Sequence, residues 1–368
     1  MFGKKVLKGQ PSRTDAVITD AGPCQKQVRV QVPAEEIAPI RAAVLGEFQK
    51  EASLPGFRKG KTPLELVEKH YAKPVREETL HRVTQHIFER VVKEHNLKPV
   101  GPFQLSRADY QDGSSLTLEA TVEVEPEFAL GEYRGIPLMR ASAEVSSGDI
   151  AQALSKLQES MAQLVPVTEG APKERQVPPL DDELAKDLGF KTLEELRTHV
   201  EAKLREQQRS AQQRALEADL CDELLKRHAF AVPPHLVSHQ TERLTRDFKV
   251  RLLLAGRTEA QVDEEAAKFT EQLRTNAERY VKLSFILDRV AEKESVTVAQ
   301  QEVVNHLWQV AQRWQKDPTE VRKFFDAQGL WPSVVSTIRQ EKTVTRLLGA
   351  AKITNGTAST SMHTQEET

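Results

Sequence analysis

Alternating apolar and polar positions early in the chain predict a strand that leads directly into a helix. Val28, Val30 and Val32 are separated by an arginine and a glutamine, the period-two pattern of a strand with one buried face. A proline ends this strand. Apolar residues then recur at helical spacing, at Ile37, Ile40, Val44, Leu45 and Phe48. An amphipathic helix is therefore expected after the strand.

A second helix is indicated about ten residues further on. Thr62, Pro63 and Glu65 have the spacing of an N-cap, a first-turn proline and the glutamate of a capping box. Pro74 is expected to kink or restart this helix, because proline lacks the amide hydrogen that a helix interior needs. Its apolar face continues through Val83, Ile87 and Val91.

A hairpin completes a small α+β domain. Apolar and polar residues alternate between Phe103 and Val124 on both sides of an Asp112–Gly113 pair, which predicts two strands joined by a turn. We expect residues 14–130 to form one α+β domain, preceded by a flexible N-terminus at residues 1–13.

The remainder of the chain has apolar stripes at helical spacing, interrupted by prolines. A helix is expected from Ser146 to about Leu164, followed by a linker over residues 165–178. Thr192 is predicted to cap a helix of more than 30 residues. Later helices are expected from Pro233–Pro234, from Thr258 through Leu287, from Asp317 to Gly329, and over Val334–Leu348.

This pattern predicts a multi-domain protein with an elongated, mainly α-helical C-terminal part. Residues 131–180 are expected to connect the α+β domain to a helical domain at 181–354, with a disordered tail at 355–368. Two arrangements of the helices fit the stripes. They bury every stripe in a compact domain, or they form an extended bundle with arms that leaves concave surfaces open.

Composition and charge narrow the class of protein. Charged residues make up 29% and aromatic residues 5%, mean hydropathy is −0.51, and no apolar run approaches the length of a membrane span. Residues 1–13 lack the apolar core of a secretory signal, so we expect a cytoplasmic protein that contacts no membrane. Residues 1–110 hold 19 basic and 13 acidic residues, whereas the remainder has a net charge of −8. The basic end suits an anionic surface such as RNA.

Motifs for catalysis, nucleotide binding or metal binding are lacking. His235 and His239 share a helical face, but no third ligand is placed with them, and two surface histidines are the better interpretation. Cys24 and Cys221 are far apart in the sequence and are expected to be free thiols. The chain contains no GxSxG, P-loop or GxGxxG motif. We therefore expect no catalytic residue, no cofactor and no metal.

One loop differs from an ordinary connection. Gly56 and Gly60 bracket a turn that carries Phe57 together with Arg58, Lys59 and Lys61. Arginine pairs with carboxylate or phosphate through two hydrogen bonds, lysines act as point charges, and a phenylalanine provides an apolar anchor. The loop is interpreted as a docking tip for a negatively charged partner that has an apolar notch. The alternative is a basic surface turn in which Phe57 folds back onto its helix.

The loop also carries a family resemblance. Gly-Phe-Arg-Lys-Gly-Lys-Thr-Pro at residues 56–63 resembles the ribosome-docking signature of bacterial trigger factor. Similarity continues through Val122–Phe128 and resumes at Leu180–Gly189 and Val232–Val237. The resemblance thus covers most of the chain, more loosely toward the C-terminus.

The resemblance implies an ATP-independent chaperone. In that family the docking loop binds a ribosomal protein and adjacent rRNA beside the exit tunnel, and a helical cradle with two arms shelters unfolded or nascent polypeptides. Carried over by position, Gly56, Phe57, Arg58, Lys59, Gly60 and Lys61 are the ribosome-binding residues. The resemblance implies no DNA partner and leaves open whether the free protein is a monomer or a homodimer.

The chain departs from the family pattern in one large respect. The family usually inserts an FKBP-like peptidyl-prolyl isomerase domain before the helical body, but only 14 residues separate Leu164 from Pro179 here. A folded domain needs about 50 residues or more. We therefore expect a variant without isomerase activity. The alternatives are an active isomerase, as in full-length family members, and a helical adaptor that does not bind ribosomes.

Overall fold

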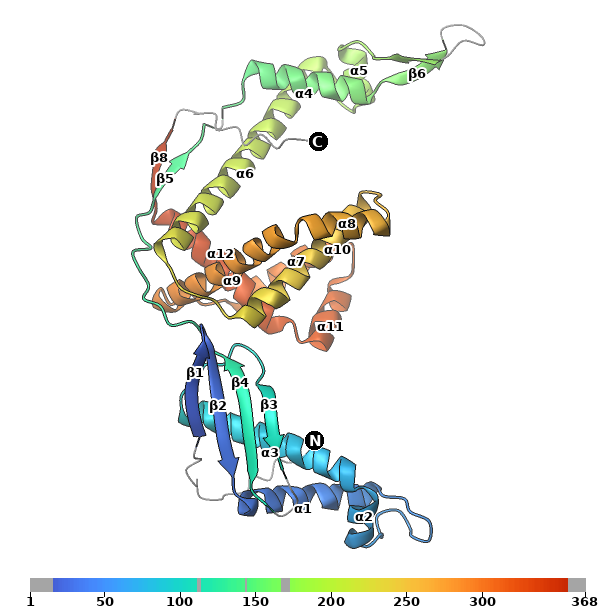
Figure 1. Ribbon diagram of the computed structural model, residues 1–368. Helices are drawn as coiled ribbons and strands as arrows, with labels where there is room; N and C mark the ends of the chain where they lie inside the picture. Colours follow the sequence, from blue (N-terminus) through green and yellow to red (C-terminus); the bar gives the residue numbers. More distant parts are fainter. Residues whose placement is uncertain (1–15, 111–113, 143, 167–172, 357–368) are drawn as a thin grey trace. The chain divides into compact units, whose positions relative to one another are not determined.

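A four-stranded antiparallel sheet forms the centre of the N-terminal part (Figure 1). The computed structural model describes residues 16–110, 114–142, 144–166 and 173–356. The strands, in the order β1-β2-β4-β3 across the sheet, are β1 (Ala16–Gly22), β2 (Gln25–Val32), β4 (Leu116–Glu123) and β3 (Gln104–Asp109). Three helices accompany them: α1 (Ala34–Glu51), α2 (Leu64–His70) and α3 (Ala72–Glu94).

The sheet buries one face against α3. Val28, Val30 and Val32 are at most 1% exposed, and they belong to the same apolar cluster as Ile87 and Val91 of α3. Burying each aliphatic side chain contributes about 1.5–3 kcal/mol relative to leaving it exposed. The strand, the helix after it and the hairpin predicted from the sequence are therefore confirmed. The Asp112–Gly113 turn and the N-terminal stretch 1–13 lie outside the described residues.

Nine helices and four short strands make up the described part of the chain beyond residue 130 (Figure 1). The helices are α4 (Ser147–Ser160), α5 (Asp182–Asp187), α6 (Leu193–Arg227), α7 (Pro234–Leu254), α8 (Glu259–Lys268), α9 (Thr270–Lys293), α10 (Gln300–Trp314), α11 (Pro318–Gln328) and α12 (Trp331–Gly349). The strands pair in twos: β5 (Pro137–Arg140) runs parallel to β8 (Lys352–Asn355), and β6 (Gln163–Pro166) runs antiparallel to β7 (Lys173–Gln176).

Several predicted helix ends are confirmed. The α6 helix has 35 residues, and the hydroxyl of Thr192 accepts a hydrogen bond from the backbone N–H of Glu195 at 3.3 Å. The α7 helix begins at Pro234. The carboxylate of Asp317 caps α11, and Gly329 ends that helix in the left-handed conformation that glycine adopts without strain.

Three expectations about helix ends are wrong. The α4 helix ends at Ser160 rather than near Leu164, Leu164 lies in β6 instead, and β7 lies within the segment expected to be a linker. The predicted helix from Thr258 through Leu287 is two helices, with a break at Phe269. Thr62 does not cap α2, because the N-cap is Pro63 and no side chain hydrogen-bonds there. Proline fixes a backbone conformation suited to a helix start without help from the threonine.

The chain divides into two compact units, residues 1–129 with 229–285 and residues 130–228 with 286–368. In the first unit the Glu123 carboxylate at the end of β4 accepts a hydrogen bond from the backbone N–H of His235 in the first turn of α7, at 2.8 Å. The Cys24 thiol donates to the carbonyl of Ala231 at 3.2 Å. These contacts tie the sheet to α7. The domain boundaries inferred from the sequence stay a prediction, and residues 357–368 of the expected tail lie outside the described residues.

In the second unit, the Glu294 carboxylate, directly after α9, contacts three other side chains. Its carboxylate accepts hydrogen bonds from the Tyr133 hydroxyl at 2.9 Å and from Arg134, and it forms an ion pair with Arg346 of α12 at 3.3 Å. Hydrogen bonds from Arg134 and then from Tyr133 hold the pKa of the Glu294 carboxyl below its usual value. This cluster fastens the connecting segment near residue 133 to two helices.

We expect a Glu294→Gln variant to be less stable at neutral pH and to have a flatter dependence of stability on pH. Because the folded-state pKa of Glu294 is lowered, its contribution is fully present above the unfolded pKa of about 4.3 and is lost as the pH falls through the folded pKa. Urea unfolding at about pH 7 and about pH 3 measures this difference. An equal loss of stability in both proteins on acidification would contradict the assignment.

Candidate functional site: a basic loop and exposed apolar faces

The loop between α1 and α2 consists of two successive turns. The carbonyl of Leu54 accepts the N–H of Phe57 at 3.1 Å, and the carbonyl of Arg58 accepts the N–H of Lys61 at 2.9 Å. The third residue of each turn is a glycine with positive φ, 88° at Gly56 and 79° at Gly60. A type II turn requires this conformation at that position, and glycine adopts it at no steric cost. The two glycines of the signature therefore determine the course of the loop.

The base of the loop is attached to the last turns of α1. The Gln49 side-chain amide donates to the carbonyl of Thr62 at 2.8 Å, and Thr62 is fully buried. At Gly60, a Cβ atom would lie 3.5 Å from the carbonyl oxygen of Lys50, so the loop backbone runs close to the helix. The loop is held in one conformation rather than left as a free connection.

The side chains between these anchors project outward. Phe57 keeps 41% of its surface exposed, and Arg58, Lys59 and Lys61 are exposed as well. None of these three cations forms an ion pair with a carboxylate of the described residues. The structure thus brings together the residues that the sequence singled out. The exposed part of the Phe57 ring, beside these unpaired cations, is accessible to a partner.

Two further exposed leucines follow the loop and were not predicted. Leu64 and Leu66 of α2 are exposed, whereas Val67 beside them is fully buried. A seven-residue helix with one buried face has no internal use for apolar residues on its other side. The signal in the sequence was three apolar residues within four positions of a short polar helix. Together with Phe57 they enlarge the apolar part of the candidate docking surface.

The helices of the second unit carry an aromatic face at α10 and α11. Trp308 is 54% exposed, and Trp314 and Phe324 are also exposed, with the last two rings meeting edge to face at 5.9 Å. Phe325 and the partly buried Trp331 pack below, in the cluster that holds these helices together. Of these five aromatic residues, two therefore lie in the core and three at the surface.

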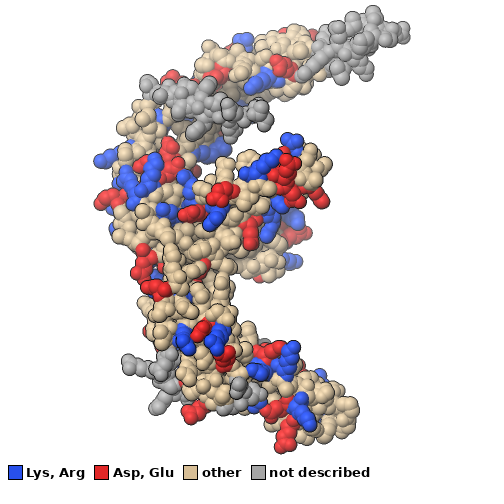
Figure 2. All heavy atoms as spheres, viewed as in Figure 1, with Lys and Arg blue, Asp and Glu red and all other residues tan. Residues whose placement is uncertain are grey.

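A second apolar face lies where α7 is followed by α8. Leu254 is 83% exposed, and Val250, Leu253 and Phe269 are exposed too. Around such faces, basic and acidic side chains are interspersed over the helices, as Figure 2 shows for one side of the molecule. Large exposed apolar side chains on a charged frame are typical of an interaction surface.

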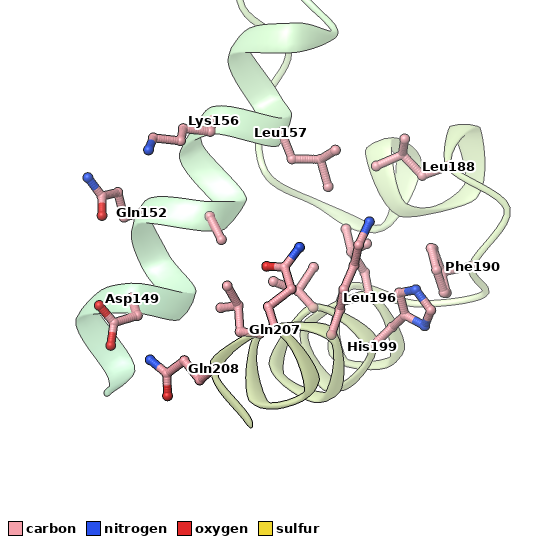
Figure 3. Close-up of a pocket in the computed structure, with 14 residues that line it drawn as sticks. Asp149, Gln152, Lys156, Leu157, Leu188, Phe190, Leu196, His199, Gln207 and Gln208 are labelled. Atoms are coloured by element: carbon pink, nitrogen blue, oxygen red, sulfur yellow. The ribbon is translucent and has the colours of Figure 1, made fainter. Parts of the chain in front are cut away.

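A cavity of about 570 Å³ lies between α4 and α6 (Figure 3). Its lining combines the apolar side chains of Leu157, Leu188 and Phe190 with the amides of Gln152 and Gln207. This mixture suits an extended peptide, whose apolar side chains and backbone amides both need partners.

The described residues give little support for metal binding or for insertion into a membrane. They contain no group of three or more His, Cys, Asp or Glu side chains suited to a metal ion. None of the described helices is long and apolar enough to cross a membrane. Cys24 and Cys221 form no disulfide, as predicted, and burial followed by the charge of Glu123 raises the pKa of the Cys24 thiol.

An exposed basic loop together with apolar faces on a charged helical frame is typical of a chaperone, a protein that binds chains before they bury their own apolar surface. Two family models match the chain: bacterial trigger factor protein over residues 15–157, and the C-terminus of bacterial trigger factor protein over residues 192–349. The chain belongs to the bacterial trigger factor family. It acts as a molecular chaperone that assists protein folding.

Relatives and a solved structure agree with this family. The chain is 24% identical to the trigger factors of Citrifermentans bemidjiense and Carboxydothermus hydrogenoformans, with 90% and 89% of this chain and 96% of each relative covered. A solved trigger factor chaperone, described for promiscuous substrate recognition in folding and assembly, has the same fold with a TM-score of 0.54. It is 18% identical, and the match covers 90% of this chain and 99% of that one.

The two family matches leave little room for a further domain in the middle of the chain. Only residues 158–191 lie between the two matched segments, which is too few for a folded isomerase domain. The alignment with the first relative has 420 positions but contains 90% of this chain, about 331 of its 368 residues, so about 89 positions of that relative have no counterpart here. The chain is therefore a trigger factor variant without the isomerase domain.

Proposed function

We propose that this chain docks beside the exit tunnel of the ribosome through Gly56–Lys61 and shelters nascent polypeptides without using ATP. The observation that carries the proposal is the exposed Phe57 ring beside unpaired cations, on a loop whose turns are set by two glycines and whose base is anchored to α1. A preorganised loop binds with less loss of conformational entropy than a flexible one. The partners are a ribosomal protein and the adjacent rRNA, and the site of action is the cytoplasm.

The apolar faces supply the holding function. A nascent chain exposes apolar segments before it can bury them, and these segments aggregate if they meet one another. The aromatic face of α10 and α11, the apolar face at the end of α7 and the cavity beside α4 offer separate, modest apolar contacts. Several weak contacts retain varied clients without tight binding of any one sequence, so release needs no energy source.

Co-sedimentation of the intact chain with ribosomes tests the docking half of the proposal. We expect the chain to sediment with the large subunit and to be released by high salt, because cations and phosphates dominate the contact. A helical adaptor with an incidental basic loop would remain in the supernatant at every salt concentration.

We further propose that the chain is not a peptidyl-prolyl isomerase. Isomerisation in the FKBP manner needs an apolar pocket, lined largely by aromatics, that removes the twisted amide from water. The segment between the two family matches, residues 158–191, contains a single aromatic, Phe190, and the pocket beside it also holds amide and charged side chains.

We expect no acceleration of cis/trans exchange in a short X-Pro peptide beyond the uncatalysed time of tens of seconds. NMR exchange spectroscopy with the full chain measures this rate, and a full-length relative that retains the isomerase domain provides the positive control. Catalytic turnover by this chain would make the isomerase function the correct one.

A further inference from the structure

The charges of the docking domain are distributed unequally between arginine and lysine. Apart from Arg58, every arginine within residues 16–110 contacts a carboxylate or carbonyl of the protein itself. The pairs are Arg29–Glu119, Arg41–Glu68, Arg76 with the Tyr110 carbonyl, Arg82 with Glu47 and Glu78, Arg90–Glu36 and Arg107–Asp109. The arginines are thus occupied by contacts within the domain.

The unpaired cations of this domain are mainly lysines, and they gather at one end. Within residues 16–110, the lysines without an ion pair are Lys50, Lys59, Lys61, Lys69 and Lys93. Two of them belong to the docking loop. Lys50 and Lys69 lie in the last turns of α1 and α2, the helices on either side of it, and both side chains are exposed. Only Lys93 lies elsewhere, in the last turn of α3.

The structure places Lys50 and Lys69 close to the loop. The backbone of Lys50 is within 3.5–3.8 Å of the Cβ position of Gly60. The α2 helix has seven residues and is therefore about 10 Å long. Its C-cap residue, Tyr71, meets Phe48 of α1 at a ring distance of 6.0 Å. Both lysines therefore extend the basic surface of the loop along two adjoining helix ends.

We infer that Lys50 and Lys69 contact the phosphate backbone of ribosomal RNA and form the RNA-binding flank of the docking surface. This inference rests on the proposed function of the loop. A lysine ammonium is a mobile point charge that neutralises phosphates without reading bases. Phe57, with the exposed Leu64 and Leu66, supplies the apolar contact to ribosomal protein. The surface thus has an apolar part for protein and a lysine flank for RNA.

Lys93 provides a control that distinguishes RNA binding from the ordinary stabilisation of a helix end by lysine. Lysines in a last helical turn interact favourably with the negative end of the helix, and this could account for Lys50 and Lys69 without any partner. Lys93 has the same position in α3, is exposed and is unpaired, but it lies far along the chain from the docking loop. A Lys93→Ala variant therefore removes the same charge from the same kind of helix end.

The experiment measures binding of the full chain to ribosomes over a series of KCl concentrations. Each phosphate contact contributes about 0.7–0.9 to the slope of log affinity against log salt concentration. We expect Lys50→Ala and Lys69→Ala each to reduce the magnitude of the slope by about that amount, and the double variant to reduce it by about twice as much. Lys93→Ala is expected to leave the slope unchanged.

Hydroxyl-radical footprinting of the ribosomal RNA identifies the partner. We expect the unaltered chain to protect a short stretch of rRNA backbone, and the Lys50→Ala/Lys69→Ala variant to lose that protection while it still binds. Unchanged slopes in ribosome-binding variants would overturn the inference and leave the proposed function intact. Reduced slopes with unchanged protection would indicate an acidic protein partner and would overturn it too. Failure of the unaltered chain to bind ribosomes would overturn both.

Discussion

Replacing Phe57, Arg58 and Lys59 together by alanine is expected to weaken ribosome binding by about a hundredfold or more. Aromatic anchors and arginines carry most of the binding energy of an interface, and truncating each typically costs about 2 kcal/mol or more. A change of about 1.4 kcal/mol corresponds to a tenfold change in affinity. The fold should survive, because these side chains project from turns whose glycines remain in place. Co-sedimentation with ribosomes measures the loss, and thermal unfolding checks the fold.

The chain offers a control of the same composition. Arg322, Lys323 and Phe324 are consecutive exposed residues on α11, outside the docking domain. Their replacement by alanine removes the same three residue types and the same charge. We expect this variant to bind ribosomes as the unaltered chain does. Binding by the loop variant at the level of this control would show that the loop is not the docking site.

Removing the aromatic face of α10 and α11 is expected to impair the holding of clients at least tenfold. Trp308, Trp314 and Phe324 each leave roughly half of a large ring surface open, about 100 Å² per side chain. At about 25 cal/mol per Å² such a ring contributes at most about 2.5 kcal/mol when a client covers it. Light scattering of an aggregating client, titrated with the triple alanine variant, measures the loss.

Each of the two triple variants serves as a control for the other. The Phe57/Arg58/Lys59 variant should suppress aggregation in the absence of ribosomes as well as the unaltered chain does, since its apolar helical faces are untouched. The Trp308/Trp314/Phe324 variant should still co-sediment with ribosomes. Loss of both activities in either variant would indicate misfolding or a single shared site, and the separation of docking from holding would then be wrong.

Local signals in the sequence were sufficient for most elements and for the turns of the loop at residues 56–61. Proline and glycine impose backbone conformations on their own, so the starts of α7 and α11 and the turns at Gly56 and Gly60 follow from residue type. The threonine cap of α6 is likewise a contact across three residues. Such features depend on neighbours in the chain and are therefore visible before any fold is known.

Features that depend on distant partners were not predictable in this way. Leu164 continues the helical spacing of α4, yet pairing with β7 turns its segment into a strand. Leu138 of β5 pairs with Ile353 of β8 more than 200 positions away, and neither short segment has a strong strand pattern. The exposure of Leu64 and Leu66 was also hidden, because periodicity alone does not say which apolar residues lack a covering partner.

The cap of α7 by Glu123 has a consequence for the synthesis of this protein. The carboxylate and the backbone N–H that it accepts are 112 positions apart, and Ala231 reaches Cys24 across 207. At about 5–20 residues per second, the ribosome takes about 6–22 s to add the 112 residues after Glu123. During this time the emerging sheet lacks the hydrogen bond from the His235 N–H to the Glu123 carboxylate. Phe128 likewise lacks the ring of Phe230, on which it stacks in the folded protein. This chaperone therefore exposes apolar surface during its own synthesis, and under the proposed function it is one of its own clients.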